Sequence, residues 1–410
     1  MTLTEVFVDS KPRIALLSRE YPPEIYGGAG VHLEYLAREL ARHVDLGVYC
    51  FGAPRTAPEV AASYQPWSAL DGPQAYLAAL RTLSVNLAMT AGVEQASLVH
   101  SHTWYANFAG RLSQLVHQVP HVMTTHSLEP LRPWKAEQLG GGYRLSSFCE
   151  QNAIEAADAV IAVSQGMKAD ILRVYPTVSA ARVHVIHNGI DPEEYRPDPA
   201  TDVLARHGID PARPYAVFVG RITRQKGVIH LLEAARYFSP ELGLVLCAGE
   251  PDTPEIAKEV RELVGVLRQS RSGVAWIEEM LPRPALIQIL SHARVFVCPS
   301  VYEPFGIVNL EAMACCAPVV GSRVGGIPEI VVDGSTGWLV GFEADGTTHG
   351  TPRDREAFAR ALAEPVNRLG ADQALAERMG RAGRKRVVDL FSWQAIARKT
   401  AELYKNLLEG

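Results

Sequence analysis

Two cations, Arg221 and Lys226, lie between glycines in residues 220–227 (GRITRQKG). A buried-strand pattern ends at Gly220 and a helical pattern starts at Gly227, which predicts a loop at the carboxyl edge of a parallel sheet. In such a loop Arg offers a planar fork for two hydrogen bonds to a phosphate, while Lys offers a compact charge. We therefore expect both side chains to converge on one anion, and two solvated surface cations are the alternative.

Two carboxylates follow a later strand pattern. Glu303 and Glu311 flank the turn that contains Phe305, Gly306 and Ile307. Backbone N–H groups at this turn would be free at a helix start, and a carboxylate can accept hydrogen bonds from a pair of sugar hydroxyls. The segment therefore predicts a sugar site. The alternative is a charge that complements the helix dipole and a second, exposed Glu.

A glycine-rich segment follows the first strand pattern of the chain. Gly27, Gly28 and Gly30 precede a helical stretch, so their backbone N–H groups could approach an anion at the helix N-terminus. A tight turn between strand and helix is the alternative. Residues 325–329 (GGIPE) form a similar turn, for which a structural role is also open.

A histidine and three cations follow another strand pattern of the first half. His126 stands directly after that strand, where a satisfied structural histidine is the alternative to a catalytic one. Arg132, Lys135 and Arg144 come next, and they would suit a phosphate group. Aromatic residues such as Trp134 would equally suit stacking on a sugar chain, and a solvated charged face is the third interpretation.

The elements that must position these residues occur in two series. Short apolar runs alternate with longer amphipathic stretches, which is typical of doubly wound parallel sheets with helices on both faces. The first series of expected strands covers 14–17, 47–50, 98–100, 121–124, 159–163 and 183–187, and the second covers 216–219, 244–248, 274–277, 295–298, 319–321 and 338–340. Expected helices include 31–42, 151–157, 229–238, 254–270 and 355–369.

A loop separates the two series. Residues 187–199 (HNGIDPEEYRPDP) contain Asn-Gly and three prolines, which marks a linker. The predicted fold class is therefore α/β, with two Rossmann-like, doubly wound domains facing a central cleft. We expect an N-terminal extension at 1–10, domains at 11–195 and 200–390, and a C-terminal helix at 391–410 that returns to the first domain. Ligands of such sheets bind at the carboxyl ends of the strands.

Composition excludes several classes of protein. The chain has 410 residues, with 40 Lys+Arg against 45 Asp+Glu, and this net charge of -5 argues against a nucleic-acid partner. A hydrophobic content of 47% argues against disorder. The sequence has no long apolar run and no signal-peptide pattern, so we expect neither a membrane span nor secretion. Six Cys without a C-x-x-C pair predict reduced thiols and a cytoplasmic location.

The chain resembles the retaining glycosyltransferases of family 4, which have the GT-B fold. Three features taken together carry this resemblance: the segment around Arg221 and Lys226, the pair Glu303 and Glu311, and residues 325–329. The resemblance runs from about residue 13 to 405. Residues 18–24 (SREYPPE), 101–105 (SHTWY) and 126–135 (HSLEPLRPWK) are further similar to the actinobacterial-type ADP-glucose enzymes, the glycogen synthases and α-maltose-1-phosphate synthases. The chain lacks the Lys-Thr-Gly-Gly-Leu loop of the longer classical bacterial glycogen synthases.

The resemblance implies retaining transfer of glucose from ADP-glucose in α-1,4 linkage. Arg221 and Lys226 would hold the donor diphosphate and stabilise the leaving ADP. Glu311 would bind the ribose hydroxyls. Glu303 would hold the glucose, together with the backbone of Phe305, Gly306 and Ile307. The domain at 200–390 would thus bind the nucleotide sugar.

The domain at 11–195 would then bind the acceptor. His126 would contact the transferred sugar near its 6-hydroxyl, and the loop with Gly27, Gly28 and Gly30 would close over the phosphates. Arg132, Lys135 and Arg144 favour glucose 1-phosphate as the acceptor, giving α-maltose 1-phosphate. Elongation of an α-glucan, as in glycogen synthesis, is the alternative.

The sequence contains no Asp-x-Asp pair for a divalent metal on a nucleotide sugar. We therefore expect no catalytic metal and no cofactor, with Arg221 and Lys226 neutralising the diphosphate. A UDP-sugar transferase, a nucleotide-sugar epimerase and a non-catalytic sugar-nucleotide sensor stay open. A nicotinamide dehydrogenase is disfavoured, because no strand is followed by G-x-G-x-x-G and a later acidic residue. The chain is compatible with a homo-oligomer.

Overall fold

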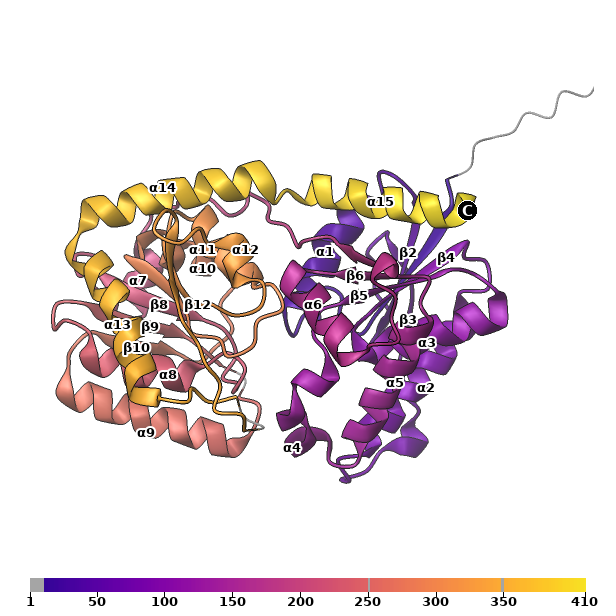
Figure 1. The fold of residues 1–410 in the computed structure, drawn as a ribbon, viewed down its shortest axis with the longest axis horizontal. Helices are drawn as coiled ribbons and strands as arrows, with labels where there is room; N and C mark the ends of the chain where they lie inside the picture. The colour runs from indigo at the N-terminus through magenta and orange to yellow at the C-terminus, as the bar shows by residue number, and fades with distance from the viewer. Residues whose placement is uncertain (1–10, 250, 348–349) are drawn as a thin grey trace, which may run out of the picture.

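The computed structural model describes residues 11–249, 251–347 and 350–410. The predicted extension at residues 1–10 lies outside the described residues. Within them, strands and helices alternate and form one parallel sheet of seven strands and one of six. The two sheets confirm the predicted fold class, and Figure 1 shows the two domains side by side.

The first sheet has the strand order β3-β2-β1-β4-β5-β6-β7, with every neighbouring pair parallel. Its strand β1 is buried on both faces, because Ile14 and Leu16 enter one core while Ala15 and Leu17 enter the other. A strand covered on both faces reads as a continuous apolar run, which is why it could be predicted. The strands are β1 (Arg13–Ser18), β2 (Asp45–Phe51), β3 (Val60–Tyr64), β4 (Leu98–His102), β5 (His121–Thr125), β6 (Ala159–Ala162) and β7 (Val183–Val185).

Helices cover both faces of the first sheet. The helices α1 (Gly28–Leu40) and α15 (Trp393–Glu409) pack on one face, where Leu33 and Tyr404 join the same core. Met89 of α2 (Leu77–Gly92) and Ala106 of α3 (Thr103–His117) pack on the other. The remaining helices of this half are α4 (Ala136–Leu139), α5 (Gly142–Ala156) and α6 (Gln165–Val174).

The second sheet has the strand order β10-β9-β8-β11-β12-β13 and is also parallel. Its strands are β8 (Tyr215–Val219), β9 (Gly243–Cys247), β10 (Val274–Ile277), β11 (Val295–Cys298), β12 (Val319–Ser322) and β13 (Gly337–Val340). Its helices are α7 (Asp202–Arg206), α8 (Val228–Ala234), α9 (Pro254–Ser270), α10 (Arg283–His292), α11 (Ile307–Ala314), α12 (Ile327–Ile330), α13 (Arg355–Ala371) and α14 (Gln373–Leu390).

Local signals explain why some boundaries were predicted and others were not. Helix α9 has the predicted bounds, and its start is explained by Thr253, which caps the N-terminus, and by Pro254 in the first turn. The half-buried edge strand β3 was not expected, since it lacks an apolar run. The expected helix at 151–157 is only the end of α5, which already begins at Gly142.

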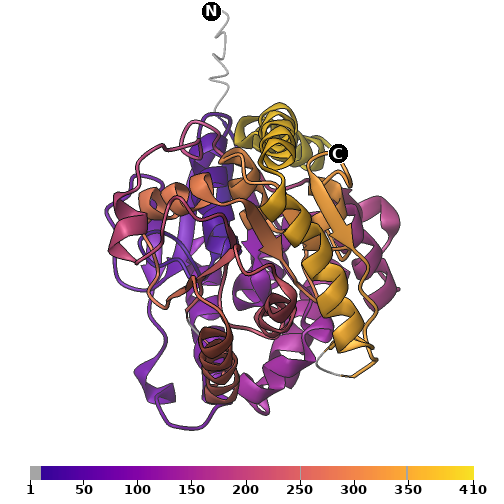
Figure 2. The ribbon, with the colours of Figure 1, turned by 90° about the vertical axis from the view of Figure 1, so that its left-hand side faces the viewer.

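The chain crosses between the domains twice at one place. Ile190 of the linker donates its N–H to the carbonyl of Phe391 over 2.8 Å and forms a parallel bridge with Ser392. Helix α14 then lies along the second domain and α15 along the first (Figure 1). Figure 2 shows these yellow helices nearly end-on at one edge of the molecule. The last helix therefore belongs to the core of the first domain.

Candidate active site

Four loops at the carboxyl ends of strands carry most of the predicted site residues. They follow β1 and β5 in the first sheet, and β8 and β11 in the second. In each sheet these strands lie at or next to the centre of the strand order. Because all strands of a parallel sheet end at the same edge, the loops of each domain lie together there.

Lys226 and Glu303 contact each other in the second domain. Lys226 Nζ lies 2.7 Å from Glu303 Oε2, and Ser300 Oγ donates to the same oxygen over 3.0 Å. The Glu303 side chain is 6% exposed and that of Lys226 24%, so the pair is buried at its carboxylate and open at its ammonium. The structure thus brings together one cation and one carboxylate predicted to bind the donor.

Arg221 has a different carboxylate partner and also reaches the first domain. Its Nη1 lies 3.2 Å from Asp252 Oδ1 and donates to the hydroxyl of Tyr26 over 2.8 Å. The guanidinium carbon stands 4.3 Å from the centre of the Tyr26 ring. Arg221 therefore links the loop after β8 with the glycine-rich loop across the cleft.

The turn before α11 is shaped by close backbone approaches. Gly306 caps the helix with φ 101°, and a Cβ at this position would lie 2.3 Å from Asn309 Nδ2. Phe305 is 1% exposed and belongs to the core, so its ring does not face the cleft. Ile307 faces the other domain, since a Cβ on Gly28 would lie 3.8 Å from its Cδ1.

Glu311 lies on α11, about one helical turn after Ile307. It is 6% exposed, and the Tyr195 hydroxyl donates to its Oε1 over 3.1 Å. Burial raises the pKa of Glu311 to about 7, and the hydrogen bond from Tyr195 opposes that rise. Near neutral pH the carboxyl group therefore passes between a proton donor and a pure acceptor.

The glycine-rich loop already holds a carboxylate of its own chain. Glu20 Oε2 accepts hydrogen bonds from the backbone N–H of Tyr26 and Gly27, each over 2.8 Å. A Cβ on Gly30 would lie 2.7 Å from the same oxygen, so a larger residue here would push the Glu20 carboxylate away from these hydrogen bonds. The backbone N–H of Gly27 is thus already paired with a carboxylate of the first domain. Gly28, in contrast, lies close to Ile307 of the second domain and therefore faces the cleft.

His126 stands in a cluster of histidines. Its Nε2 lies 3.1 Å from Nδ1 of His102, and its ring centre lies 4.7 Å from that of His32. Burial lowers the pKa of His126 well below its usual value, and the neighbouring rings of His32 and His100 lower it further. The ring is therefore neutral at pH 7 and can donate one hydrogen bond.

Two of the three predicted acceptor cations, Lys135 and Arg132, lie around a buried carboxylate. Lys135 Nζ lies 3.1 Å from Glu129 Oε1, and both residues are buried. Arg132 Nη1 lies 3.8 Å from the same oxygen and donates to Ser127 Oγ over 2.9 Å. Arg144 is exposed on α5. The residue before it, Tyr143, donates its hydroxyl to the Glu129 carbonyl. The charge of Lys135 is thus already balanced.

A second buried carboxylate supports this arrangement. Glu150 Oε1 accepts hydrogen bonds from the N–H of Glu129, over 2.8 Å, and from the Tyr175 hydroxyl, over 2.7 Å. Burial and the charge of Glu129 raise the pKa of Glu150 to about 8. The segment that carries Lys135 is therefore fixed to α5 by buried polar contacts.

Several residues at the cleft were not predicted as site residues. Arg19 places its guanidinium carbon 4.2 Å from the centre of the Tyr105 ring, and Lys135 Nζ lies 5.5 Å from the same ring. Asp252 and Tyr26 complete the contacts of Arg221. Arg19 comes directly after β1, so its place at the edge of the sheet was the signal that could have found it.

An open groove of about 540 Å³ lies between the domains beside these residues. Gln138 Nε2 of the first domain donates to the Asp252 carbonyl of the second over 3.4 Å. The groove therefore reaches the residue that pairs with Arg221. It is lined by Glu137, Gln138, Arg224, Asp252, Thr253, Pro254 and Glu255.

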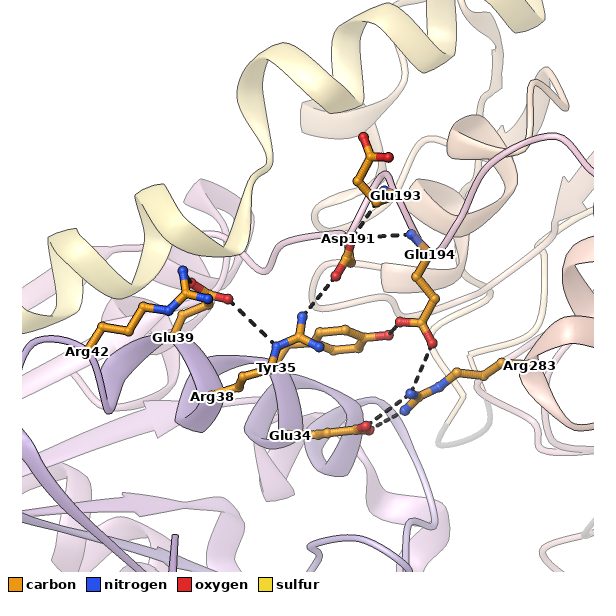
Figure 3. A network of polar contacts seen from close by, with 9 residues as sticks. All are labelled: Glu34, Tyr35, Arg38, Glu39, Arg42, Asp191, Glu193, Glu194 and Arg283. Atoms are coloured by element: carbon orange, nitrogen blue, oxygen red, sulfur yellow. Dashed lines mark hydrogen bonds and ion pairs between the residues drawn. The ribbon is translucent and has the colours of Figure 1, made fainter. Parts of the chain in front are cut away.

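A network of charges joins the two domains near the linker (Figure 3). Arg283 of α10 binds Glu34 of α1, with its Nη1 3.0 Å from Oε1, and lies 3.4 Å from Glu194 of the linker. Tyr35 donates its hydroxyl to Glu194. The relative position of the domains is thus also held by contacts away from the glycine-rich loop.

None of the helices in the described parts of the chain is long and apolar enough to cross a membrane.

A family model described as Glycosyltransferase Family 4 matches residues 26–194, and one described as Glycosyl transferases group 1 matches residues 201–386. The α-maltose-1-phosphate synthase of Mycolicibacterium smegmatis is 55% identical over 398 residues, which cover 96% of this chain and 99% of that protein.

Two further comparisons are more distant. The glycogen synthase of Mycobacterium tuberculosis is 31% identical over 96% of this chain and 94% of its own length. Among solved structures, the sucrose-phosphate synthase of Thermosynechococcus elongatus matches with a TM-score of 0.79 at 27% identity, over 97% of this chain and 100% of that one. The chain therefore belongs to glycosyltransferase family 4, and its two facing parallel-sheet domains have the GT-B fold.

Proposed function

We propose that this protein transfers glucose from ADP-glucose to glucose 1-phosphate with retention of configuration, giving α-maltose 1-phosphate. The observation that carries the proposal is the 55% identity to an α-maltose-1-phosphate synthase over 96% of the chain. Identity to a glycogen synthase over the same share is 31%. Elongation of an α-glucan is therefore the less favoured activity.

The second domain would bind the donor. Arg221 and Lys226 would hold the diphosphate and stabilise the charge that develops on the leaving ADP. In support of this, each cation has a carboxylate partner that could release it to a phosphate: Asp252 for Arg221 and Glu303 for Lys226. Cationic side chains can neutralise the diphosphate, so we propose transfer without a metal ion or other cofactor.

The sugar and the ribose would each meet one carboxylate. Glu303, freed from Lys226, and the backbone N–H groups at residues 305–307 would bind the glucose hydroxyls. Glu311 would accept hydrogen bonds from the ribose, for which its ionised form is the better acceptor. Its burial supports this role, because hydrogen bonds are stronger where water is excluded.

The proposed reaction needs no covalent intermediate on the enzyme. The 4-hydroxyl of glucose 1-phosphate attacks C1 of the donor glucose from the face on which ADP departs. The bond between C1 and the β-phosphate oxygen breaks, and the hydroxyl proton passes to that oxygen, so that ADP leaves and the α-linkage is retained. Neutral His126 would donate a hydrogen bond to the transferred sugar and fix its position.

The acceptor phosphate would lie among the cations of the first domain. The sequence predicts three cations for it: Arg132, Lys135 and Arg144. Because Lys135 is buried and already paired with Glu129, we propose that this lysine stabilises the site without contacting the phosphate itself. Arg19 is exposed beside Tyr105 and adds a cation at the same edge. We propose that Arg19 and Arg132 make the direct contacts.

The test is product analysis by mass spectrometry after treatment with a chelator. ADP-glucose is supplied with either glucose 1-phosphate or glycogen, and UDP-glucose replaces it in a parallel series. A disaccharide phosphate from ADP-glucose and glucose 1-phosphate supports the proposal. Extension of glycogen alone would contradict the acceptor, and transfer only from UDP-glucose would contradict the donor.

A further inference from the structure

Three histidines from three different elements meet beside the cleft. His32 lies on α1, His102 ends β4 and His126 follows β5. One ring nitrogen of each lies within 4.8 Å of those of the other two, and His102 Nδ1 is 3.1 Å from His126 Nε2. The sheet order β1-β4-β5 brings these elements together at one edge.

The contacts of His32 leave one of its nitrogens without a partner. Its Nδ1 lies 2.7 Å from Asn188 Oδ1, which can only accept, so Nδ1 carries the proton and Nε2 carries a lone pair. That Nε2 is buried and has no hydrogen-bond partner, and His32 is 3% exposed. Buried polar atoms almost always have a partner, so this one points to a ligand.

His102 has the same deficiency. Its Nε2 is also buried without a partner, and the residue is 0% exposed. The nitrogen of His102 that meets His126 is Nδ1, so Nδ1 would be the ligand atom and Nε2 would carry the proton. The orphaned Nε2 of His32 is therefore the atom that points to a ligand, and the third member, His126, is partly exposed and opens the cluster to solvent. No carboxylate belongs to this group of ligand atoms.

We propose that His32, His102 and His126 bind one divalent transition-metal ion, for which Zn²⁺ fits best. Imidazole nitrogens suit Zn²⁺ and its neighbours, whereas Mg²⁺ and Ca²⁺ require oxygen ligands. Zn–N bonds of about 2.0–2.1 Å place the nitrogens of a tetrahedral site roughly 3.4 Å apart, so small ring rotations suffice. Asn188 acts as the outer partner that fixes the ring of His32, as such partners do at metal sites.

The ion acts as an inhibitor of the transfer reaction. His126 is the proposed contact of the transferred sugar, and an ion bound to its ring would fix the orientation of the ring and place a positive charge beside the sugar. This consequence rests on the proposed function, whereas binding of the ion does not. The transfer itself needs no metal.

The binding test uses Co²⁺, whose visible absorption bands report tetrahedral nitrogen sites, on the full chain after dialysis against a chelator. We expect about one equivalent to bind, with displacement by Zn²⁺ and no response to Mg²⁺. His32→Asn places an amide nitrogen near Nδ1, which keeps the bond to Asn188 and removes the Nε2 ligand. We expect this variant to bind Co²⁺ at least tenfold more weakly. His43→Asn, at an exposed histidine outside the cluster, serves as the control and binds as the parent does.

If His32→Asn does not fold, as judged by its thermal melt, His102→Asn is measured in its place. Absence of saturable binding, or equal affinity in the parent and the folded variant, overturns the site. In the activity assay, micromolar Zn²⁺ should stop transfer by the parent, and a chelator should restore it. Binding of the ion without loss of transfer supports the metal site and overturns the sugar contact of His126.

Discussion

At the scale of single residues, the cations of the second domain are held by carboxylates that compete with a ligand. Lys226 is bound to Glu303 while both stand at the proposed donor site. Lys226→Met removes the charge that would meet the diphosphate, so we expect kcat to fall about 10²–10³-fold, as when one transition-state contact is lost. Steady-state kinetics with ADP-glucose measure this, with Lys258→Met on the exposed face of α9 as the control. A loss below threefold would contradict the assignment.

Glu311 gives a pH dependence of stability. Burial raises its pKa to about 7, so the folded state keeps a proton that the unfolded chain releases above its ordinary pKa. The free energy of unfolding therefore falls as pH rises from about 4.5 to 7, and the loss is complete above that range. Glu311→Gln lacks this loss. We expect its stability relative to the parent to increase between pH 5 and pH 8, by at most on the order of 3 kcal/mol.

The measurement is the difference in Tm between Glu311→Gln and the parent at the two pH values. A constant difference would contradict the raised pKa. A difference that changes in the opposite direction would mean that the carboxylate, rather than the acid, is stabilised by the fold.

The residues of the candidate site differ in how far the sequence could predict them. Arg221, Lys226 and Glu303 adjoin glycine turns that follow apolar strands, so their place at the sheet edge could be inferred. Their contacts could not, since the approach of Tyr26 to Arg221 depends on how the two domains face each other. The three-histidine cluster could not be predicted from the sequence either, because its members are distant in the chain and only the order of the strands in the sheet brings them together.

At the scale of elements, the turn before α11 depends on a glycine. Gly306→Ala forces a side chain into φ 101° and places its Cβ against Asn309. Gly334 also has a positive φ, of 73°, but no atom stands near its Cβ position. We expect Gly334→Ala to cost about 1–2 kcal/mol with unchanged kinetics. Gly306→Ala should cost more and reduce transfer at least tenfold, as seen by Tm and kcat/KM. Equal effects of the two variants would contradict a special role of this turn.

Elements covered on both faces could be predicted best. The central strands β1, β8 and β11 read as apolar runs because both of their faces are covered. Strand β3 was missed because, at the edge of the sheet, only part of it is buried. The start of α5 was missed because Gly140, Gly141 and Gly142 indicate a turn. The helix that follows them packs against α3 and α2, and these tertiary contacts are not visible in the local sequence.

At the scale of the whole molecule, the network of Figure 3 controls how the domains meet. Arg283 and Glu34 have side chains 30% and 27% exposed, so their pairing contributes about 1 kcal/mol. Arg283→Met removes this pair, and it also removes a positive charge that favours the ionised form of Glu311. We expect a larger radius of gyration of the free protein in small-angle scattering and about a fivefold lower kcat/KM.

Salt provides the matched comparison for this variant. Raising the ionic strength should reduce kcat/KM of the parent more than that of Arg283→Met, because screening weakens the same pair. Arg360→Met, which removes an exposed pair on α13, should behave as the parent does. An identical salt response of Arg283→Met and the parent would mean that the network does not hold the domains.

The return of α15 to the first domain has a consequence for synthesis on the ribosome. The core that Trp393 and Tyr404 complete is otherwise built from residues up to Ile186. At 5–20 residues per second, roughly 200 intervening residues take roughly 10–40 s to emerge. During that time the nascent first domain carries an uncovered apolar seam along α1 while the second domain is already being made. The domain that is translated first is therefore the one that is finished last, and a chain that stops short by one helix leaves its earlier half open to aggregation.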